Sequence, residues 1–374
     1  MKKLIILFVL LGTEFSVMAN DGVFYAQGST LIPLRETVIR MQKEILSLDR
    51  KGEWMQVDIY FEFFNPGAPR ELTVGFVTPP AFGDVEGGEE EGGAHPQIRD
   101  FMVMAGNEIL PYKKTRMKDS GFRISDSLSG GYDFVYYFQV NFPKGLSVIR
   151  HSYMYRGGMS VEEKQAFFYR LSTGSSWAGG RIGDFELNIN MGDDSYFAVP
   201  ASFGAGTADW TLVGVGRISP VLRYAMFGME DEARQLRMVY LRKGKLQLRK
   251  KDFSPRTDLS LVVFQLHNEI RLWGNSEKHT LSRLTELWWM ESDSVAAFLP
   301  RLSDAELRAF RNLNYARRGM LFKDEGLRKL FSSFFWYLPD PLVSTEGTPD
   351  YYLTKEQLQL IREEENRRKN KPAG

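Results

Sequence analysis

Along most of the chain, from residue 21 to about residue 267, hydrophobic and polar residues alternate with a period of two. Such alternation is typical of β-strands that bury one face and expose the other. It is clearest at residues 55–65, 132–142 and 185–191, and residues 259–266 form a more continuous apolar run that indicates a more buried strand. The pattern therefore predicts many short strands in this part of the chain.

Turn-forming residues separate the predicted strands. They occur at residues 65–69, 105–108, 129–133, 156–158 and 242–245. Many short strands with turns between them, and few helical stretches, are typical of antiparallel sheets, most simply a β-sandwich. Length alone leaves open whether these residues form one elaborate sandwich or two small ones.

The period changes to that of an α-helix near residue 279. Leu281, Leu284 and Trp288 recur at helical spacing and form one face. Ser303 and Glu306 have the spacing of a capping box, which predicts the start of a further helix. Gly319 is placed to end that helix, because the residue after a helix often needs a positive φ.

Two more helices are predicted toward the C-terminus. Asp324 is a candidate N-cap for a short helix that buries Leu327, Leu330 and Phe331. Further on, Thr354 and Gln357 form a second capping box ahead of a highly charged helix. That helix has only a narrow apolar edge, so we expect it to dock lightly and to fray into a charged tail.

These patterns predict a chain that is mostly β with some α. We expect a signal peptide at residues 1–19, an antiparallel β-sandwich-like domain at 20–275 and a small α-helical domain at 276–340. A linker and a charged C-terminal helix or tail follow at 341–374.

The first nineteen residues predict export. Lys2 and Lys3 precede an apolar run at residues 4–12, and small Ala19 precedes Asn20, where we expect cleavage. The run is too short to span a bilayer, which takes roughly 20 apolar residues. A retained anchor is the alternative interpretation, and export by itself leaves open whether the protein resides in the periplasm or on the cell surface.

The composition argues against several kinds of site. The chain has no cysteine, which excludes disulfides, a thiol nucleophile and cysteine-ligated zinc. Its four histidines form no closely spaced pair, and no G-x-S-x-G motif is present. A formal charge of +1 argues against general binding to nucleic acid or anionic membranes. We therefore expect no metal, no cofactor, no nucleic-acid partner and no transmembrane segment in the mature chain.

Two charged stretches have a functional and a structural interpretation. Residues 83–96 are rich in carboxylates and glycine, so they are a calcium loop or, as we prefer, a solvated loop between strands. Residues 242–251 hold six cations, with Leu246 and Leu248 on one strand face. They are a patch for phosphate groups or, as we prefer, a solvated hairpin whose lysines protect a sheet edge.

The N-terminal part resembles a secreted bacterial domain of unknown function. Members of that family have a strand of the form I-x-M-x-x-E-x-L, matched here by Ile39, Met41, Glu44 and Leu46. Residues 171–189 resemble the family's L-x-T-G-x-x-W-x-G-P-I-G-x-F stretch, with arginine in place of the proline. The resemblance covers about residues 20–270 and implies location and fold rather than chemistry.

The C-terminal part resembles the YARHG domain, a small extracellular bacterial module. The "YAR" of its signature falls on residues 315–317, its glycine on Gly319 and its "WY" on residues 336–337. Arg318 replaces the signature histidine and Asn314 replaces an apolar residue. The resemblance covers about residues 300–340, and any histidine chemistry of the family is therefore not expected here.

Four residues of this part are candidate ligand-binding residues, namely Tyr315, Arg317, Trp336 and Tyr337. A guanidinium suits a carboxylate, and aromatic rings suit the faces of sugars. A small module has little core, however, so the same side chains are also needed for stability. We expect Arg317 to pair with a carboxylate such as Asp324 or with loop carbonyls, and Trp336 to cover the helices.

The sequence indicates no reaction. "STGSSWAGG" at residues 172–180 places serines near glycines, but these features more often mark a turn and a packing tryptophan. We therefore expect a non-catalytic protein of the cell envelope that binds a partner protein or an envelope polymer. A hydrolase with a site dispersed in sequence is the alternative, and a purely structural surface protein is a variant of the first hypothesis.

Overall fold

The structure, a computed structural model, describes residues 27–29, 31–33, 37–78, 95–116, 134–159, 163–204, 206–224, 234–264, 283, 286–287, 290, 292–347 and 352–370. The predicted signal peptide, almost all of the acidic stretch at 83–96 and most of the helical stretch at 280–290 lie outside these residues.

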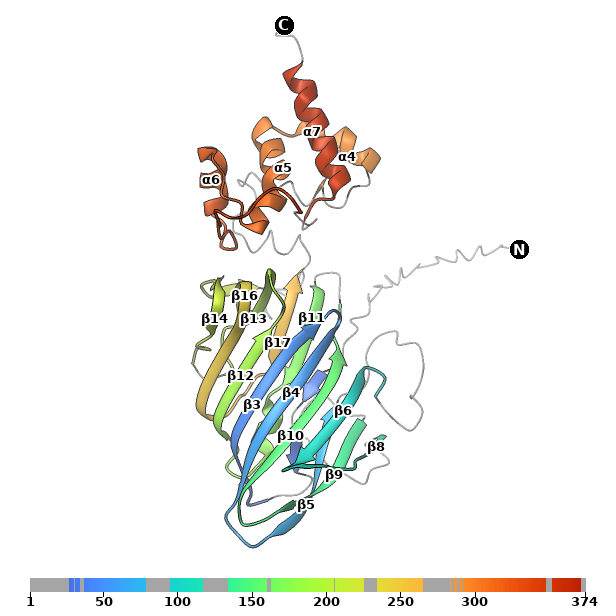
Figure 1. The fold of residues 1–374 in the computed structure, drawn as a ribbon, viewed down its shortest axis with the longest axis vertical. Coiled ribbons are helices and arrows are strands. Elements are labelled where there is room, and N and C mark those ends of the chain that lie inside the picture. The colour runs from blue at the N-terminus through green and yellow to red at the C-terminus, as the bar shows by residue number, and fades with distance from the viewer. Residues whose placement is uncertain are drawn as a thin grey trace, which may run out of the picture.

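The described strands form one thirteen-stranded sheet and one four-stranded sheet (Figure 1). In chain order they are β1 (Gln27–Ser29), β2 (Leu31–Pro33), β3 (Arg40–Lys51), β4 (Trp54–Asn65), β5 (Arg70–Thr78), β6 (Ile98–Ala105), β7 (Glu108–Ile109), β8 (Lys113–Arg116), β9 (Phe134–Phe142), β10 (Gly145–Arg156), β11 (Glu163–Arg170), β12 (Ile182–Asn190), β13 (Ser195–Pro200), β14 (Thr211–Ile218), β15 (Leu222–Tyr224), β16 (Arg234–Phe253) and β17 (Leu259–Phe264). The large sheet has the order β1-β11-β17-β13-β16-β12-β3-β4-β10-β6-β7, with β14 and β15 also on β16, and the small one has the order β2-β5-β9-β8.

The fold class predicted from the sequence, mostly β with a small helical part, is confirmed. In β4 the buried side chains are those of alternate residues, among them Val57, Ile59 and Phe61. Most neighbouring strands are antiparallel, but β1 pairs with β11 and β3 pairs with β12 in parallel. Parallel neighbours need a long connection, and the chain supplies one because Lys43 and its partner Asp184 are far apart in sequence.

The turn predicted at residues 242–245 is wrong, because β16 runs through it without interruption. Gly244, with φ of 112°, lies opposite Gly214 of β14. A Cβ atom on Gly244 would lie 2.2 Å from the carbonyl oxygen of Val213. The glycine therefore permits a close approach of two strands, which a sequence pattern cannot distinguish from a turn. The predicted orientation of Leu246 and Leu248 is confirmed, since both are buried.

A first hydrophobic core lies between the two sheets. The ring of Phe63 in the large sheet is 5.7 Å from that of Phe142 in the small sheet. Phe76 of the small sheet is likewise 4.6 Å from Tyr153 of the large one. Because one cluster of buried residues joins both sheets, the β part is a single elaborate sandwich. Trp177 is buried in this cluster, where its Nε1 donates to the carbonyl of Leu31 at 3.0 Å, so it is a packing anchor.

A second hydrophobic core lies on the outer face of the large sheet. On β13, Phe197 faces the first core, whereas Tyr196 and Ala198 face the second. The outward side chains of β16 and β17 continue this surface, and side chains of the helical part complete the cluster. We call this contact the sheet–helix interface. Its strand residues are Tyr196, Ala198, Leu236, Met238, Tyr240, Val262 and Phe264.

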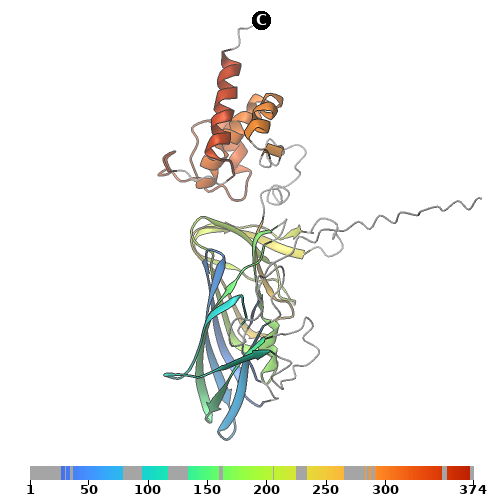
Figure 2. The ribbon, with the colours of Figure 1, turned by 90° about the vertical axis from the view of Figure 1, so that its right-hand side faces the viewer.

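The helical part follows β17 and lies over one end of the large sheet (Figures 1 and 2). It contains α4 (Ser292–Phe298), η4 (Leu299–Arg301), α5 (Asp304–Arg318), α6 (Glu325–Ser332) and α7 (Lys355–Lys369). In the described part of the chain, no helix is long and apolar enough to cross a membrane.

The predicted helix boundaries are confirmed at atomic detail. The Glu306 amide donates to Ser303 Oγ at 3.2 Å, and the Ser303 amide donates to the Glu306 carboxylate at 2.7 Å. Gly319 ends α5 with φ of 92°. The second predicted capping box, Thr354 with Gln357, starts α7 in the same way.

Two ionisable side chains lie inside the first core. Burial raises the pKa of Glu44 from 4.5 to about 8, and burial lowers the pKa of His151 from 6.5 to about 3. Glu44 is protonated in the folded state at pH values where the unfolded chain has lost that proton. The burial of Glu44 therefore lowers the free energy of unfolding least below pH 4.5. This loss of stability grows as pH rises toward 8. His151 acts in the opposite direction, below pH 6.5.

We expect Glu44→Gln to remove the loss of stability that the burial of Glu44 causes between pH 5 and pH 8. Glutamine has the shape of a protonated glutamate but cannot ionise, so the variant should be more stable than the original at pH 8. The gain should be on the order of a few kcal/mol. Urea unfolding at pH 5, 6.5 and 8 measures it, with exposed Glu71→Gln as the matched control. Parallel pH profiles for the original protein and Glu44→Gln would contradict the assignment.

Candidate functional site

Arg317 lies in the last turn of α5 and is buried in the sheet–helix interface. Its guanidinium carbon is 4.6 Å from the ring centre of Tyr240 and 5.4 Å from that of Tyr196. One guanidinium nitrogen donates to the carbonyl oxygen of Asp194 at 3.4 Å. A desolvated cation held on two aromatic rings stabilises its surroundings by about 2 kcal/mol. The contacts of Arg317 thus join α5 of the helical part to the β part.

Arg242 of β16 forms a second tie across the same interface. Its guanidinium pairs with Asp194 at 3.1 Å and with Asp340 at 3.8 Å, and it donates to the carbonyl of Arg318. That carbonyl belongs to the C-terminal end of α5, where a cation is favoured by the exposed carbonyls and the helix dipole. A residue of the predicted cationic patch therefore holds the helix in place.

Other cations of the 242–251 run also have carboxylate partners. Arg249 pairs with Glu186 at 3.1 Å, Lys250 with Asp209 at 2.6 Å and Lys251 with Asp184 at 2.9 Å. Together with Arg242, these pairs give four of the six cations a carboxylate partner, which reduces the positive charge available to phosphate groups. The preferred interpretation as a hairpin was also wrong, because the residues lie within one long strand.

Asp324, the carboxylate that was expected to pair with Arg317, has other partners. The carboxylate of Asp324 pairs with Arg308 and also caps α6 by accepting from the Leu327 amide at 2.8 Å. The hydrogen bond from this amide is the main reason that the pKa of Asp324 lies below its usual range. The other expected partner of Arg317, a loop carbonyl, is confirmed, because Arg317 donates to the carbonyl of Asp194 in the turn before β13.

Trp336 and Tyr337 are buried in the aromatic core of the helical part. The ring of Trp336 is 5.2 Å from Phe334, and the ring of Tyr337 is 6.0 Å from Phe331. The hydroxyl of Tyr337 donates to the carbonyl of Met320 at 2.8 Å. Their side chains are at most 2% exposed, so in this conformation they have a packing role and no surface for a ligand.

The sequence candidate Tyr315 lines a cavity in the helical part. This cavity, which we call the helical pocket, has a volume of about 260 Å³. Its lining residues are Asn314, Tyr315, Thr345, Gly347, Lys355, Leu358 and Arg362. Arg362 donates to the hydroxyl of Tyr315 at 3.2 Å. The structure therefore separates Tyr315 from Arg317 and brings it to an arginine of α7.

The two departures from the YARHG signature have structural reasons. Asn314 is buried, and its Nδ2 donates to the carbonyl of Leu353 at 2.7 Å. Its Oδ1 accepts from the amides of Tyr352 and Leu353, so the side chain holds the segment that leads into α7. Arg318 donates to the carbonyl of Glu346 and thereby fixes the loop beside the helical pocket.

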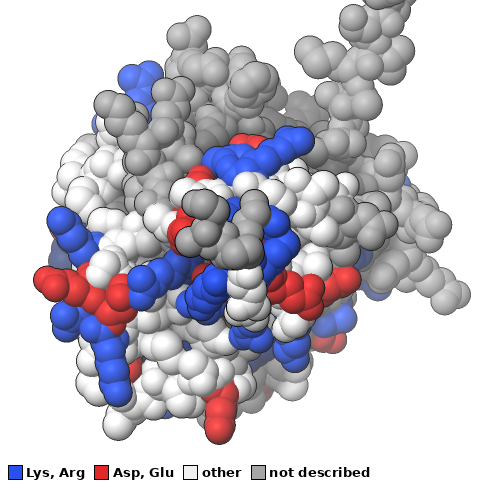
Figure 3. All heavy atoms as spheres, turned by 90° about the horizontal axis from the view of Figure 1, so that it is seen from above, with Lys and Arg blue, Asp and Glu red and all other residues white. Residues whose placement is uncertain are grey.

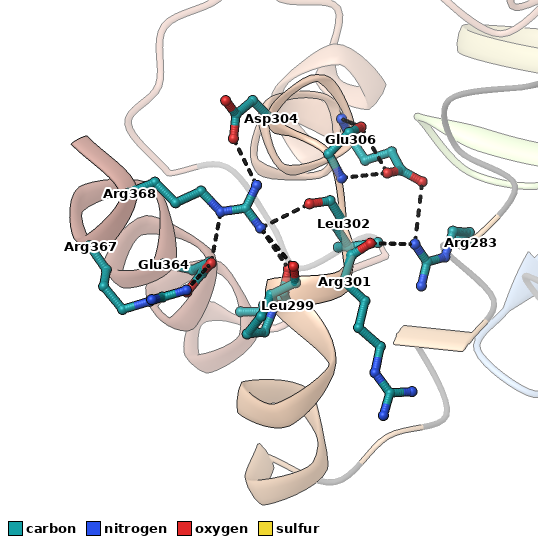
Figure 4. A network of polar contacts seen from close by, with 11 residues as sticks. Arg283, Leu299, Arg301, Leu302, Asp304, Glu306, Glu364, Arg367 and Arg368 are labelled. Carbon is teal, nitrogen blue, oxygen red and sulfur yellow. Dashed lines mark hydrogen bonds and ion pairs between the residues drawn. The ribbon is translucent and has the colours of Figure 1, made fainter. Parts of the chain in front are cut away.

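Helix α7 is held firmly, in contrast to the light docking predicted for it. Leu358 and Ile361 are buried against the other helices. Figure 4 shows Arg368 bound to Glu364, to Asp304 and to carbonyls at the end of η4. Hydrogen bonds from Arg367 and Arg368 hold the pKa of Glu364 well below its usual range.

A larger cavity lies on the outer face of the large sheet, in the region of the sheet–helix interface. We call it the lateral cavity, and its volume is about 740 Å³. Its apolar wall is formed by Ala198, Tyr224, Leu236, Val262 and Phe264, which also belong to the second core. Polar side chains complete the lining, among them Arg234, Thr257, Asp258 and Ser260. This volume and this mixture of surfaces are typical of small-molecule sites.

Asp258 is held in place at the wall of the lateral cavity. It pairs with Arg170 at 3.7 Å and accepts from the amides of Leu171 and Ser172. The hydroxyl of Ser172 donates directly to Asp258 at 3.1 Å, whereas in a catalytic triad a histidine lies between the serine and the carboxylate. This serine therefore serves the local structure. Among the described residues there is also no cluster of side chains that would hold a metal ion.

These features define a two-part protein in which a β-sandwich carries a helical unit over one end of its large sheet. Residues 285–366 match the YARHG domain, so the C-terminal part of the chain carries a YARHG domain that includes most of α7. The domain end predicted from the sequence, residue 340, comes before that helix.

The chain is also similar to a solved structure. A crystal structure called that of a "putative nutrient binding protein" from Legionella pneumophila superimposes with a TM-score of 0.55 and 21% identity. The similarity covers 92% of this chain and 99% of that one. At this identity it shows the fold alone. A search of the curated proteins gave no match.

We expect Arg317→Ala to lower the free energy of unfolding by about 2 kcal/mol, because it removes a desolvated cation from two tyrosine rings. Urea unfolding followed by tryptophan fluorescence measures the change. Arg308→Ala is the matched control, since it removes an arginine of the same helix that is half exposed and pairs with Asp324. The control should change stability little. Equal stabilities of the two variants would show that the contact across the interface does not hold the helical part.

Proposed function

We propose that the protein is an exported, non-catalytic binding protein of the bacterial cell envelope, and that it holds a small molecule in the lateral cavity. The cavity is the observation that carries this proposal. It has the volume of a small-molecule site, an apolar wall and a polar rim. The described side chains around Asp258 stabilise the fold, and none of their contacts indicates a reaction.

The position of the cavity also supports a binding role. Its apolar wall belongs to strands that are packed on both faces, β13, β16 and β17. Such strands are rigid, and a preformed wall reduces the entropy that is lost when a ligand binds. The YARHG domain, the signal-like first nineteen residues and the fold shared with a protein called a nutrient binding protein agree with this role.

Filling the lateral cavity tests the proposal. Ser260 lies on the same face of β17 as Val262 and Phe264, with a partly exposed side chain that lines the cavity. We expect Ser260→Trp to occupy the space and to reduce ligand retention at least tenfold. The purified protein is incubated with a small-molecule extract of the envelope and desalted, and the retained molecules are released and identified by mass spectrometry.

The matched control is Thr211→Trp, which adds the same side chain at an exposed position of β14 outside the cavity. It should retain the same molecules as the original protein. Equal retention by Ser260→Trp and Thr211→Trp, or a failure of the original protein to retain any molecule, would contradict a ligand site in this cavity.

Export is tested separately. Expression of the full chain in a bacterium with an intact secretion system should yield a mature protein that begins at Asn20. Fractionation followed by N-terminal sequencing measures this. A chain that keeps its first nineteen residues, or that stays in the cytoplasm, would contradict the proposed location without affecting the cavity.

A further inference from the structure

We propose that the helical pocket is a second binding site, and that it takes a small molecule carrying a phosphate group. The pocket lies between α5 and α7, on the helical part, and none of its lining residues is shared with the lateral cavity. The proposal is therefore independent of the ligand that the lateral cavity holds.

Two cations of α7 line this pocket. Lys355 and Arg362 are seven residues apart, which is two helical turns, so both project from the same face of the helix. The rise between their Cα atoms is about 10.5 Å, and both side chains are long enough to converge on a group midway. Leu358 lies between them and provides an apolar floor for the pocket.

The charges of these two side chains are not balanced within the described structure. Several other arginines of the helical part are paired with carboxylates, as in Arg311 with Glu365 at 3.0 Å and Arg367 with Glu364 at 2.7 Å. By contrast, Lys355 and Arg362 have no carboxylate oxygen within 4.0 Å among the described residues. Two cations beside one small pocket therefore give it a local positive potential.

This potential is local rather than a property of the whole face. Seen from the helical end of the molecule, lysine and arginine are interspersed with aspartate and glutamate (Figure 3). A surface of mixed sign attracts no anion over a long range. Selectivity must therefore come from the positions of the donors in the pocket, and a small anion suits it better than a long polyanion.

The donors suit a phosphate group. Arg362 donates to the hydroxyl oxygen of Tyr315, which orients the guanidinium and leaves the hydroxyl proton of Tyr315 free to point toward a ligand. Lysine, arginine and tyrosine then offer donors from both helices. A tetrahedral dianion can accept from all three, whereas a planar carboxylate has fewer acceptor directions. The volume of about 260 Å³ leaves room for a small substituent on the phosphate.

Of the two sequence candidates Tyr315 and Arg317, only Tyr315 belongs to the proposed phosphate site. Tyr315 stays in the site, but its partner is Arg362 of α7, because Arg317 points the other way and contacts Tyr240. Arg318 acts as a positioning residue, since its guanidinium holds the carbonyl of Glu346 beside Gly347 on the pocket rim.

Isothermal titration calorimetry of the full chain with glycerol 3-phosphate, at low ionic strength and pH 7, tests the proposal, and acetate is the comparison ligand. We expect saturable binding of glycerol 3-phosphate and at least tenfold weaker binding of acetate. Arg362→Gln and Lys355→Gln should each weaken the phosphate ligand about tenfold or more. Tyr315→Phe should weaken it less, since it removes one donor and no charge.

The matched control is Arg308→Gln, which removes one positive charge from the same domain outside the pocket. It should bind as the original protein does. Because Lys355 and Arg362 are exposed, their variants should melt at the same temperature as the original, which separates binding from folding. Ser260→Trp should also keep the phosphate ligand, so that failure of this site and failure of the lateral cavity are distinguishable.

A phosphate group can come from a soluble metabolite or from a lipid headgroup. Sedimentation with vesicles of phosphatidic acid, against vesicles of phosphatidylcholine, distinguishes the two sources. Binding of the soluble ligand alone assigns a metabolite, and Arg362-dependent binding to phosphatidic acid assigns a headgroup. The absence of binding to both probes, or equal loss in Arg308→Gln and Arg362→Gln, would overturn the proposal.

Discussion

The structure depends on the burial of the outer face of the large sheet by the helical part. β13, β16 and β17 carry apolar side chains on both faces, and a sheet of this kind is stable in water only when both faces are covered. The sandwich covers one face, and the YARHG domain packs against the other face at one end of the sheet. Arg317 is buried in this contact with its charge on the rings of Tyr196 and Tyr240.

This constraint explains why the signature residues of the C-terminal domain differ in role. Arg317, Trp336 and Tyr337 are buried, one between the two parts and two in the helical core. Tyr315 lies on another side of α5 and faces a pocket with Arg362. A motif that looks like one functional cluster in sequence is thus divided among an interface, a core and a cavity. The lateral cavity and the helical pocket lie on different elements, which allows two ligands to bind without competing.

Local signals were read correctly because they act between neighbours in the chain. The two capping boxes, the positive φ of Gly319 and the alternation in β4 each depend on a few consecutive residues. The errors have a common cause as well. Gly244 looked like part of a turn because its strand partner, Gly214, is thirty residues away. Likewise, Asp324 looked like the partner of Arg317 because both lie in one short module. The continuous apolar runs at residues 196–199 and 238–241 were the available signal for a sheet covered on both faces.

The sequence by itself determined the strands and helices, their caps, the mostly β class and the YARHG domain, because periodicity and capping are properties of short segments. Only the tertiary structure decided that Arg317 joins the two parts, that Glu44 is enclosed in the sandwich core and that Tyr315 meets Arg362. Each of these outcomes depends on which distant segments come together. That choice is made by the simultaneous burial of many apolar side chains, and no single stretch of sequence contains it.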